Sequence, residues 1–326
     1  MSLQIRLYLL LGAMLGILYL AVLAIGELLG VGSFVLYAAM AVGMVLLQYL
    51  IGPSMVSWMM KIKYVSEQEQ PALHQMVAEL ARDAGIPKPK VGISDMDVPN
   101  AFAFGRTQGD ARICVTKGIM NILNKDELRA VLGHEVSHIK NHDMAFITIL
   151  SILPMILYYV AMSLIWGGMF GGSRDRKDSQ GANILPLIGI GMLVLYFITN
   201  LLVLYGSRIR EYFADQGSVK LRNEPRCLAS ALYKLTYWNA KASKQAVKQV
   251  EGMKAFFIND PSRAWTEIRE LRELDTDMSG AISSSELATL RSKRVQLGFG
   301  EKMMEVFQTH PNMLKRIKHL SSLMYQ

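Results

Sequence analysis

The sequence predicts an α+β fold, mainly α, in a polytopic membrane protein with about four transmembrane helices and a cytoplasmic domain that contains a small sheet. Of its 326 residues, 51% are hydrophobic and only 19% are charged. Short strand-like runs between the second and third apolar stretches predict the sheet. An apolar helix needs about 20 residues to cross a hydrocarbon core of about 30 Å. Four uncharged stretches meet this length: Leu7 to Gly26, Leu28 to Met60, Met144 to Gly172 and Ser179 to Ser207.

Basic residues beside these stretches predict their orientation. Lys61 and Lys63 follow the second stretch, Arg208 and Arg210 follow the fourth, and the link Glu27 to Ser33 contains neither Lys nor Arg. Because short cytoplasmic loops are enriched in Lys and Arg, we expect the N-terminus and the segment after Lys61 in the cytoplasm. The loop expected outside is an exception, since it contains Arg174, Arg176 and Lys177, partly offset by Asp175 and Asp178.

The first apolar stretch is interpreted as a retained helix. It lacks a small-residue cleavage site, and a second apolar stretch follows almost at once, unlike a signal peptide. The formal net charge of +8 is interpreted as Lys and Arg that meet anionic lipid. No nucleic-acid partner is expected, because no basic run is interleaved with aromatic residues. Cys114 and Cys227 are isolated, which gives no disulfide framework and is typical of a reducing compartment.

Between the two predicted hairpins, the sequence predicts one helix and three strands. Residues Gln70 to Ala84 have Pro71 at the start and Gly85 just after the end, as helices prefer. The expected strands are Lys90 to Ser94, Ala101 to Gly105 and Ala111 to Thr116. Residues Asn100 to Gly105 are the expected edge strand, to which an extended peptide could add.

A metal-binding motif follows the strands. His134, Glu135 and His138 form an HExxH sequence, and Asn124 with Glu127 predicts a capping box at the start of its helix. Residues i and i+4 share a helix face, so both imidazoles can bind one metal ion. Glu135, rotated by about 100° from His134, can reach a water at that ion. This arrangement is typical of zincin-type hydrolases.

Two histidines do not complete a catalytic zinc site, which usually has three protein ligands. His142 follows His138 by four residues, but this spacing matches no known ligand pattern, and a metzincin would need His at position 144, which is Met. Glu211 and Asp215 are four residues apart on the predicted helix Arg208 to Lys220. We favour Glu211 as the third ligand and Asp215 as the partner of a ligand histidine.

Several strings resemble the HtpX family of bacterial membrane zinc endopeptidases, which is related to the CAAX prenyl endopeptidases. They are Pro99 to Ala103, His134 to His138 with Asn141 and Asp143, Ser207 to Leu221, and Thr309 to Pro311 with Arg316 and Ile317. The resemblance runs from the first apolar stretch to the C-terminus. Asn312 departs from it, because a second proline is common there.

The resemblance implies an inner-membrane protease that faces the cytoplasm and acts on membrane or misfolded proteins. Glu211 would be the third zinc ligand and Asp215 its supporting residue. It also implies that His310 stabilises the transition state and that four residues bind the substrate backbone: Asn100, Ala101, Phe102 and Ala103.

The chain is expected to divide into four consecutive parts. A transmembrane hairpin (1–60) precedes a cytoplasmic part with the sheet and the HExxH helix (61–143). A second hairpin (144–207) precedes a cytoplasmic helical part (208–326), with helices at Glu224 to Ala240 and Met313 to Met324.

The HtpX resemblance does not predict the segment Ser262 to Gly300 (262–300), which we call the insert. It contains a twelve-residue sequence with the spacing of an EF-hand calcium loop. Apolar residues on both sides, Leu271 and Leu274, then Leu287 and Leu290, predict flanking helices. EF-hands normally pair, and no second loop is visible. The predicted calcium ligands are Asp275, Asp277, Ser279, the Ala281 carbonyl, Ser283 and Glu286.

The main functional hypothesis is zinc-dependent peptide-bond hydrolysis with Glu135 as general base, and calcium at the insert as a modulator. The alternative is a membrane scaffold or calcium sensor with a structural zinc. Glu135 disfavours it, because a structural site does not use a general base. A transporter is disfavoured because the four stretches contain no ionisable residue for a transport path.

Overall fold

The computed structural model describes residues 43, 46, 47, 50–170, 184–242, 257, 258, 264–292 and 298–324. The first predicted transmembrane stretch, most of the second and the basic loop 174–177 lie outside these ranges, so their structure stays a prediction. The described residues fall into two compact units. One contains the residues up to Ile51 and Phe146–Gly206, and the other contains Gly52–Ala145 and Ser207–Gln326.

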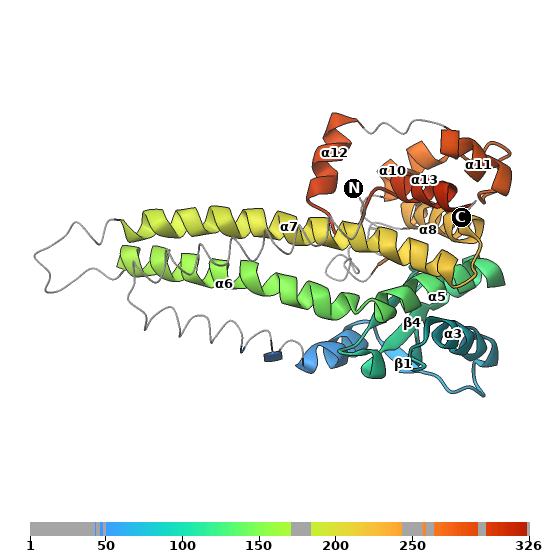
Figure 1. The fold of residues 1–326 in the computed structure, drawn as a ribbon, viewed down its shortest axis with the longest axis horizontal. Helices are drawn as coiled ribbons and strands as arrows, with labels where there is room; N and C mark the ends of the chain where they lie inside the picture. The colour runs from blue at the N-terminus through green and yellow to red at the C-terminus, as the bar shows by residue number, and fades with distance from the viewer. Residues whose placement is uncertain are drawn as a thin grey trace, which may run out of the picture. The chain divides into compact units, whose positions relative to one another are not determined.

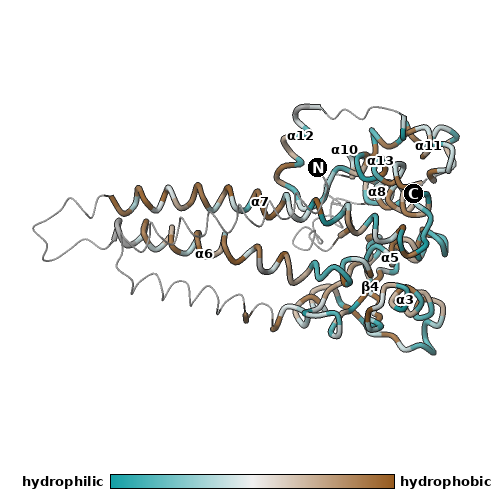
Figure 2. The backbone as a smooth tube through the Cα atoms, viewed as in Figure 1, coloured by the Kyte–Doolittle hydropathy of each residue, from teal (hydrophilic) through white to brown (hydrophobic). Residues whose placement is uncertain are grey.

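Two long apolar helices match the third and fourth predicted stretches. Helix α6 (Asp143–Phe170) and helix α7 (Leu185–Lys220) are the two described helices that are long and apolar enough to cross a membrane. Figure 2 shows their apolar character. Between them they bury Leu157, Leu164 and Met192, whereas Leu187 and Phe197 are exposed. In a bilayer, such exposed apolar side chains face lipid.

Helix α7 does not end where its apolar part ends. The sequence suggested an apolar span to Ser207 and a helix from Arg208 to Lys220, and the structure joins them into one helix. No proline interrupts the segment, so the backbone hydrogen bonds continue across the change in polarity. Glu211 and Asp215 therefore lie on the polar extension of an apolar helix.

The other unit contains a four-stranded sheet in the order β1-β2-β4-β3. Its strands are β1 (Ile62–Tyr64), β2 (Lys90–Ser94), β3 (Ala101–Phe104) and β4 (Arg112–Thr116). The three predicted strands are confirmed, and β3 is an edge strand antiparallel to β4. Strand β1 was not predicted, because three residues show too little alternation to indicate a strand.

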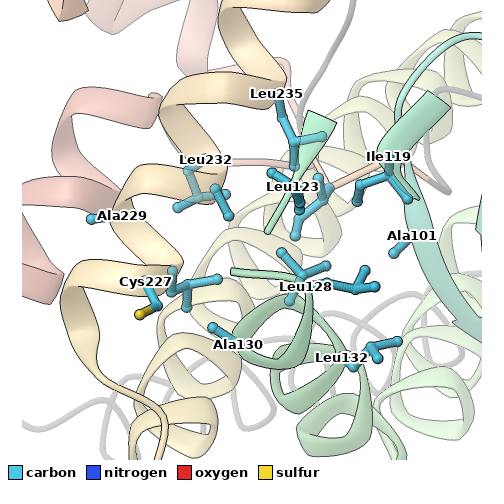
Figure 3. Packing of buried hydrophobic residues seen from close by; sticks show 14 of the residues in the cluster. Ala101, Ile119, Leu123, Leu128, Ala130, Leu132, Cys227, Ala229, Leu232 and Leu235 are labelled. Carbon is cyan, nitrogen blue, oxygen red and sulfur yellow. The ribbon is translucent and has the colours of Figure 1, made fainter. Parts of the chain in front are cut away.

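Helix α5 (Lys125–Lys140) is the centre of this unit (Figure 1). It packs against α3 (Pro71–Ala84), β3 and α8 (Pro225–Lys241), and a short helix, α4 (Lys117–Ile122), precedes it. Figure 3 shows Leu128 of α5 close to Leu232 of α8 in this core. The predicted capping box is present: Asn124 and Glu127 exchange two hydrogen bonds of 2.9 Å. Glu127 also accepts from Ser230 of α8, so the cap joins the two helices.

The insert packs onto the same core. Helices α10 (Ala264–Leu271) and α11 (Ser284–Ser292) flank the EF-hand-like loop as predicted, and they lie against α8 and α13 (Met313–Leu323). The predicted apolar face is buried at Leu271, Leu287 and Leu290. Helices α8 and α13 thus cover the apolar face of the insert that a second EF-hand would otherwise cover. A further helix, α12 (Phe299–Val306), was not predicted.

Helices α5 and α7 approach closely because two glycines lie at their contact. A methyl group on Gly217 of α7 would collide with the Ser137 side chain of α5, and one on Gly133 would collide with Asn223. At the same contact, Ser218 donates a 2.6 Å hydrogen bond to the Ala130 carbonyl. This crossing brings the HExxH motif next to Glu211.

We predict that Gly217→Ala separates α5 from α7 and lowers both the melting temperature and the zinc content of the purified protein. Overpacking of this kind typically costs about 1–3 kcal/mol. Gly191→Ala in the same helix is the control, because a methyl group there meets no atom within 4 Å and alanine favours a helix by about 1 kcal/mol. Equal melting temperatures for the two variants would contradict the role assigned to Gly217.

Candidate metal centre

Two helices present the three predicted metal ligands to one point. Helix α5 carries His134 and His138, whose Nε2 atoms lie 3.0 Å apart. Helix α7 carries Glu211, whose carboxylate oxygens lie 3.6 Å from His134 Nε2 and 3.5 Å from His138 Nε2. A tetrahedral zinc ion with bonds of about 2.0–2.2 Å separates its ligand atoms by about 3.3–3.6 Å. The three side chains therefore form a group that could hold a zinc ion.

Each imidazole is oriented by a carboxylate on its other nitrogen. His134 Nδ1 lies 2.9 Å from Asp215 Oδ1, and His138 Nδ1 lies 2.6 Å from Asp143 Oδ2. Because an ionised carboxylate only accepts hydrogen bonds, Nδ1 of each neutral imidazole is the donor and Nε2 holds a lone pair. Two lone pairs 3.0 Å apart repel each other unless a cation or a proton lies between them.

The chemistry of the group fits a metal ion. Burial opposes the charged form of His134, but hydrogen bonds with Asp215 and Glu211 outweigh it and raise the pKa to about 9. Burial and the adjacent His134 lower the pKa of His138 to about 4. Without a metal, the two imidazoles thus share one extra proton at neutral pH, which gives them one positive charge. A bound metal ion would displace this proton.

Buried atoms without hydrogen bonds point to the same conclusion. Among the described residues, both ring nitrogens of His310 are buried without a hydrogen-bond partner, and Glu211 Oε2 has an ion-pair contact with Arg316 but no hydrogen bond. Such atoms are costly unless something else satisfies them. Glu211 Oε2 lies 3.4 Å from His310 Nδ1, so these atoms border the same space.

His142, the other candidate ligand, lies outside the ligand group. Its backbone has a positive φ of 55° just after α5 ends, and its Nε2 lies 3.2 Å from Gln108 Nε2. The end of the helix before His142 explains this difference, because the i, i+4 spacing aligns side chains only within a helix.

Glu135 is buried beside the two histidines and next to the edge strand. Burial raises the pKa of its carboxyl group, although the His134 and His138 charges and a hydrogen bond from the Ala103 backbone oppose this shift. The Ala103 amide therefore faces α5 and not β4. A carboxyl group with a raised pKa is better suited to accept and return a proton near neutral pH.

The predicted substrate-binding residues lie along this edge, with different surroundings. Asn100 is fully buried, and its side-chain oxygen accepts a 3.1 Å hydrogen bond from the Ile258 amide. Phe102 is buried in an apolar cluster with Phe104 and Phe257. Ladder hydrogen bonds alternate along a strand, and Asn100 O accepts from Thr116 N. The backbone groups of Ala101 and Ala103 thus point toward the open edge.

Arg316 on α13 is a member of this site to which the sequence assigned no role. It is fully buried and binds both Asp215 oxygens, at 3.0 Å from Nε and 2.7 Å from Nη2. Its Nη1 lies 2.9 Å from Glu211 Oε2 and donates to the Ile258 carbonyl at 2.8 Å. Its charge therefore offsets the two carboxylates that hold the histidine ligands.

Asp143 and Arg210 form a second support that was not predicted. Asp143 contacts His138 and forms an ion pair with Arg210, the residue before Glu211. In the sequence analysis, Asp143 and Arg316 appeared only in the resemblance strings, and Arg210 was otherwise used only to predict the orientation in the membrane. No local spacing rule links residues that lie so far apart in the sequence, so their roles become visible only in three dimensions.

We predict that Arg316→Met lowers the melting temperature of the chelator-treated protein, because breaking a buried ion pair typically costs about 3–5 kcal/mol. Added zinc should restore part of this loss, since its charge also offsets Glu211. Arg316→Lys should be intermediate, and Arg82→Met, whose side chain is 76% exposed, is the control. An unchanged melting temperature for chelated Arg316→Met would refute the charge-balancing role.

The chain is similar in sequence to known proteins. A model of "Peptidase family M48" matches residues 67–324. The chain is 51% identical over 234 residues to the protein named "Protease HtpX homolog" of Methanothermobacter thermautotrophicus, covering 72% of this chain and 86% of that protein. Its identity to the "Protease HtpX homolog" of Moorella thermoacetica is 34% over 313 residues, covering 95% and 91%.

A solved structure is similar in fold. The crystal structure of S. mikatae Ste24p matches with a TM-score of 0.51 and 17% identity. The match covers 94% of this chain but only 62% of the Ste24p chain. The family model and the two relatives carry the assignment of family. The two relatives are named as homologs of the protease HtpX, and the chain itself belongs to peptidase family M48.

Proposed function

We propose that this protein is a zinc-dependent endopeptidase that cleaves membrane or misfolded proteins at the cytoplasmic face of the membrane. The observation that carries the proposal is the convergence of His134, His138 and Glu211, with Glu135 buried beside them. Membership of family M48 supports peptidase activity in general. The metal, the residue roles, the substrates and the orientation are our proposals.

His134, His138 and Glu211 would hold the zinc ion, while Asp215 and Asp143 orient the two imidazoles. When bound, zinc lowers the pKa of a coordinated water and polarises a carbonyl group. Glu135 takes the proton from the attacking water and delivers it to the leaving amine. Its position one residue after His134 places the carboxylate beside the ligands without making it one of them.

His310 would stabilise negative charge in the transition state. Both of its ring nitrogens are buried without a hydrogen-bond partner among the described residues, and Nδ1 lies 3.4 Å from Glu211 Oε2. A donor fixed in advance beside developing charge is worth several kcal/mol in other enzymes. We therefore assign His310 to the carbonyl oxygen of the substrate.

The substrate backbone would pair with the edge of β3 through Ala101 and Ala103. An extended peptide can add to an exposed sheet edge by main-chain hydrogen bonds, and the Ala103 amide already faces Glu135. Asn100 would act indirectly. Its side chain accepts a hydrogen bond from the Ile258 amide, and the Ile258 carbonyl accepts one from Arg316. The Phe102 side chain packs in the buried apolar cluster and so stabilises the position of β3.

The apolar helices α6 and α7 support residence in a membrane, and the basic residues after the second and fourth apolar stretches support a cytoplasmic active site. We place the protein in the cell membrane, the inner membrane in a bacterium. Exposed hydrophobic segments and membrane-protein loops are the substrates that such a site would meet. A scaffold with a purely structural zinc is disfavoured, because it would not require Glu135 beside the ligands.

We also propose that the loop of the insert binds calcium and modulates the peptidase. Carboxylate oxygens of Asp275, Asp277 and Glu286 lie within 4.8 Å of one another. Gly280 has a φ of 77°, as the sharp turn of an EF-hand loop requires. Ser279, Ala281 and Ser283 occupy the remaining ligand positions of the motif.

Two contacts could transmit calcium binding to the metal centre. Tyr233 of α8 donates a 3.0 Å hydrogen bond to Asp275 Oδ2, and α8 packs against the HExxH helix. Asn312, at the start of α13, donates to Glu270 of α10 at 3.2 Å, and α13 carries Arg316. Calcium binding that orders the loop would therefore affect α8 and α13, the two helices that contact the ligand-bearing elements.

Glu135→Gln should keep its zinc and lose cleavage of an unfolded model protein, because the amide preserves the shape but cannot accept the proton. Metal analysis and a gel-based cleavage assay measure both effects. Glu224→Gln, an exposed glutamate in the same unit, should behave like the unchanged protein. Residual cleavage by Glu135→Gln at the level of Glu224→Gln would exclude Glu135 as the base.

Glu286→Gln should remove calcium binding measured by calorimetry, because the position-12 carboxylate binds calcium with both oxygens. Calcium should raise the cleavage rate of the unchanged protein relative to a calcium-selective chelator, and it should not affect Glu286→Gln. Glu273→Gln is the matched control, since Glu273 is exposed and lies just before the loop. Calcium binding without any effect on cleavage would retain the site and reject the modulation.

A further inference from the structure

Helix α12 (Phe299–Val306) buries a charged side chain and exposes two of its apolar side chains. Among the residues of α12 whose burial the structure describes, Glu305 is buried, at only 9% exposed. Met303 and Met304 are 48% and 57% exposed, and Phe307, just after the helix, is 52% exposed. A helix on a soluble surface buries its apolar residues and exposes its charges. Adjacent exposed apolar side chains of this kind mark a contact with another apolar phase.

Contacts with α13 fix this orientation of the helix. Glu305 Oε1 accepts a 3.2 Å hydrogen bond from the Asn312 amide, and Glu305 Oε2 forms an ion pair with Lys315. The buried charge is thus satisfied by its neighbours. The methionines remain on the outer side because the glutamate is held on the inner side.

Arg208 places the end of α12 at the expected height of the membrane surface. Its guanidinium donates to the carbonyl oxygens of Val306 and Gln308, at 3.0 and 2.6 Å. Arg208 is also the first charged residue after the uncharged stretch 179–207. A residue that follows an apolar span directly lies at the interface between hydrocarbon and water. Val306 and Phe307 are therefore expected to lie at that interface.

We propose that α12 is an interfacial helix whose Met303, Met304 and Phe307 side chains enter the bilayer at the boundary between headgroups and acyl chains. Helices of this type insert their apolar face by about 5–10 Å. Lipid is favoured over a protein partner because Arg208 fixes the height of the helix. The proposal rests on membrane residence and does not depend on the proposed peptidase activity.

The position of α12 gives the bilayer contact a role at the proposed active site. Phe307 precedes His310 by three residues, and Arg208 lies three residues before Glu211 on the same helix. The bilayer would hold α12, and α12 would hold the segment that carries His310. The bilayer contact would thus support the segment that carries His310.

The contact with lipid can be measured by fluorescence quenching. Cys114 and Cys227, both buried, are replaced by alanine, and a bimane fluorophore is attached at Met303→Cys. Met278→Cys is the matched control, because Met278 is 91% exposed but lies in the loop of the insert. The full chain is reconstituted into vesicles of phosphatidylethanolamine and phosphatidylglycerol that contain a lipid with a nitroxide near the headgroup.

We expect the nitroxide lipid to quench the probe at position 303 several-fold more than the probe at position 278. Iodide in the water phase should show the opposite preference. Equal quenching at the two positions would overturn the proposal. Shielding of position 303 that appears only with an added unfolded protein would assign the face to a substrate. Shielding that disappears when the protein is diluted in lipid would assign it to a second copy. Either result would also overturn the proposal.

Discussion

The balance of buried charge around Arg316 is the constraint on which the metal centre depends. Three acidic side chains, Asp143, Glu211 and Asp215, are buried beside two imidazoles. Burial of an unpaired carboxylate is costly, so each needs a cationic partner when no metal is bound. Arg316 serves Glu211 and Asp215, and Arg210 serves Asp143. The ligands can therefore be held in place before a metal ion arrives, which reduces the cost of binding it.

The same requirement explains why distant segments must meet. Helix α5 supplies the imidazoles, α7 supplies the carboxylate ligand and α13 supplies the guanidinium. Gly133 and Gly217 permit the close crossing of α5 and α7, while Asn100 and Arg316 together hold both backbone groups of Ile258. The insert also stabilises α13, since Lys318 of α13 donates hydrogen bonds to two carbonyl groups at the end of α11. Packing and charge pairing thus support each other.

Much of this arrangement could be predicted from sequence, because local rules determine it. The capping box at Asn124, the strands around Ala101 and the loop at Asp275 follow from spacing and residue type. The ligand group required only helical periodicity and one carboxylate on a second helix. Arg316 could not be assigned a role in this way, because its partners Glu211 and Asp215 lie about one hundred positions earlier. Helix α12 was missed for a different reason: it has only eight residues, and so short a segment gives little periodicity.

Helices α6 and α7 each join an apolar portion of membrane length to residues of the proposed metal centre without a break. Asp143 lies at the start of α6, and Glu211 and Asp215 lie on α7 beyond its apolar part. All three carboxylates that touch the imidazoles therefore belong to helices with an apolar, membrane-length portion, whereas both imidazoles belong to α5. Glu211, the proposed third ligand, therefore belongs to the same unbroken helix as a candidate membrane span.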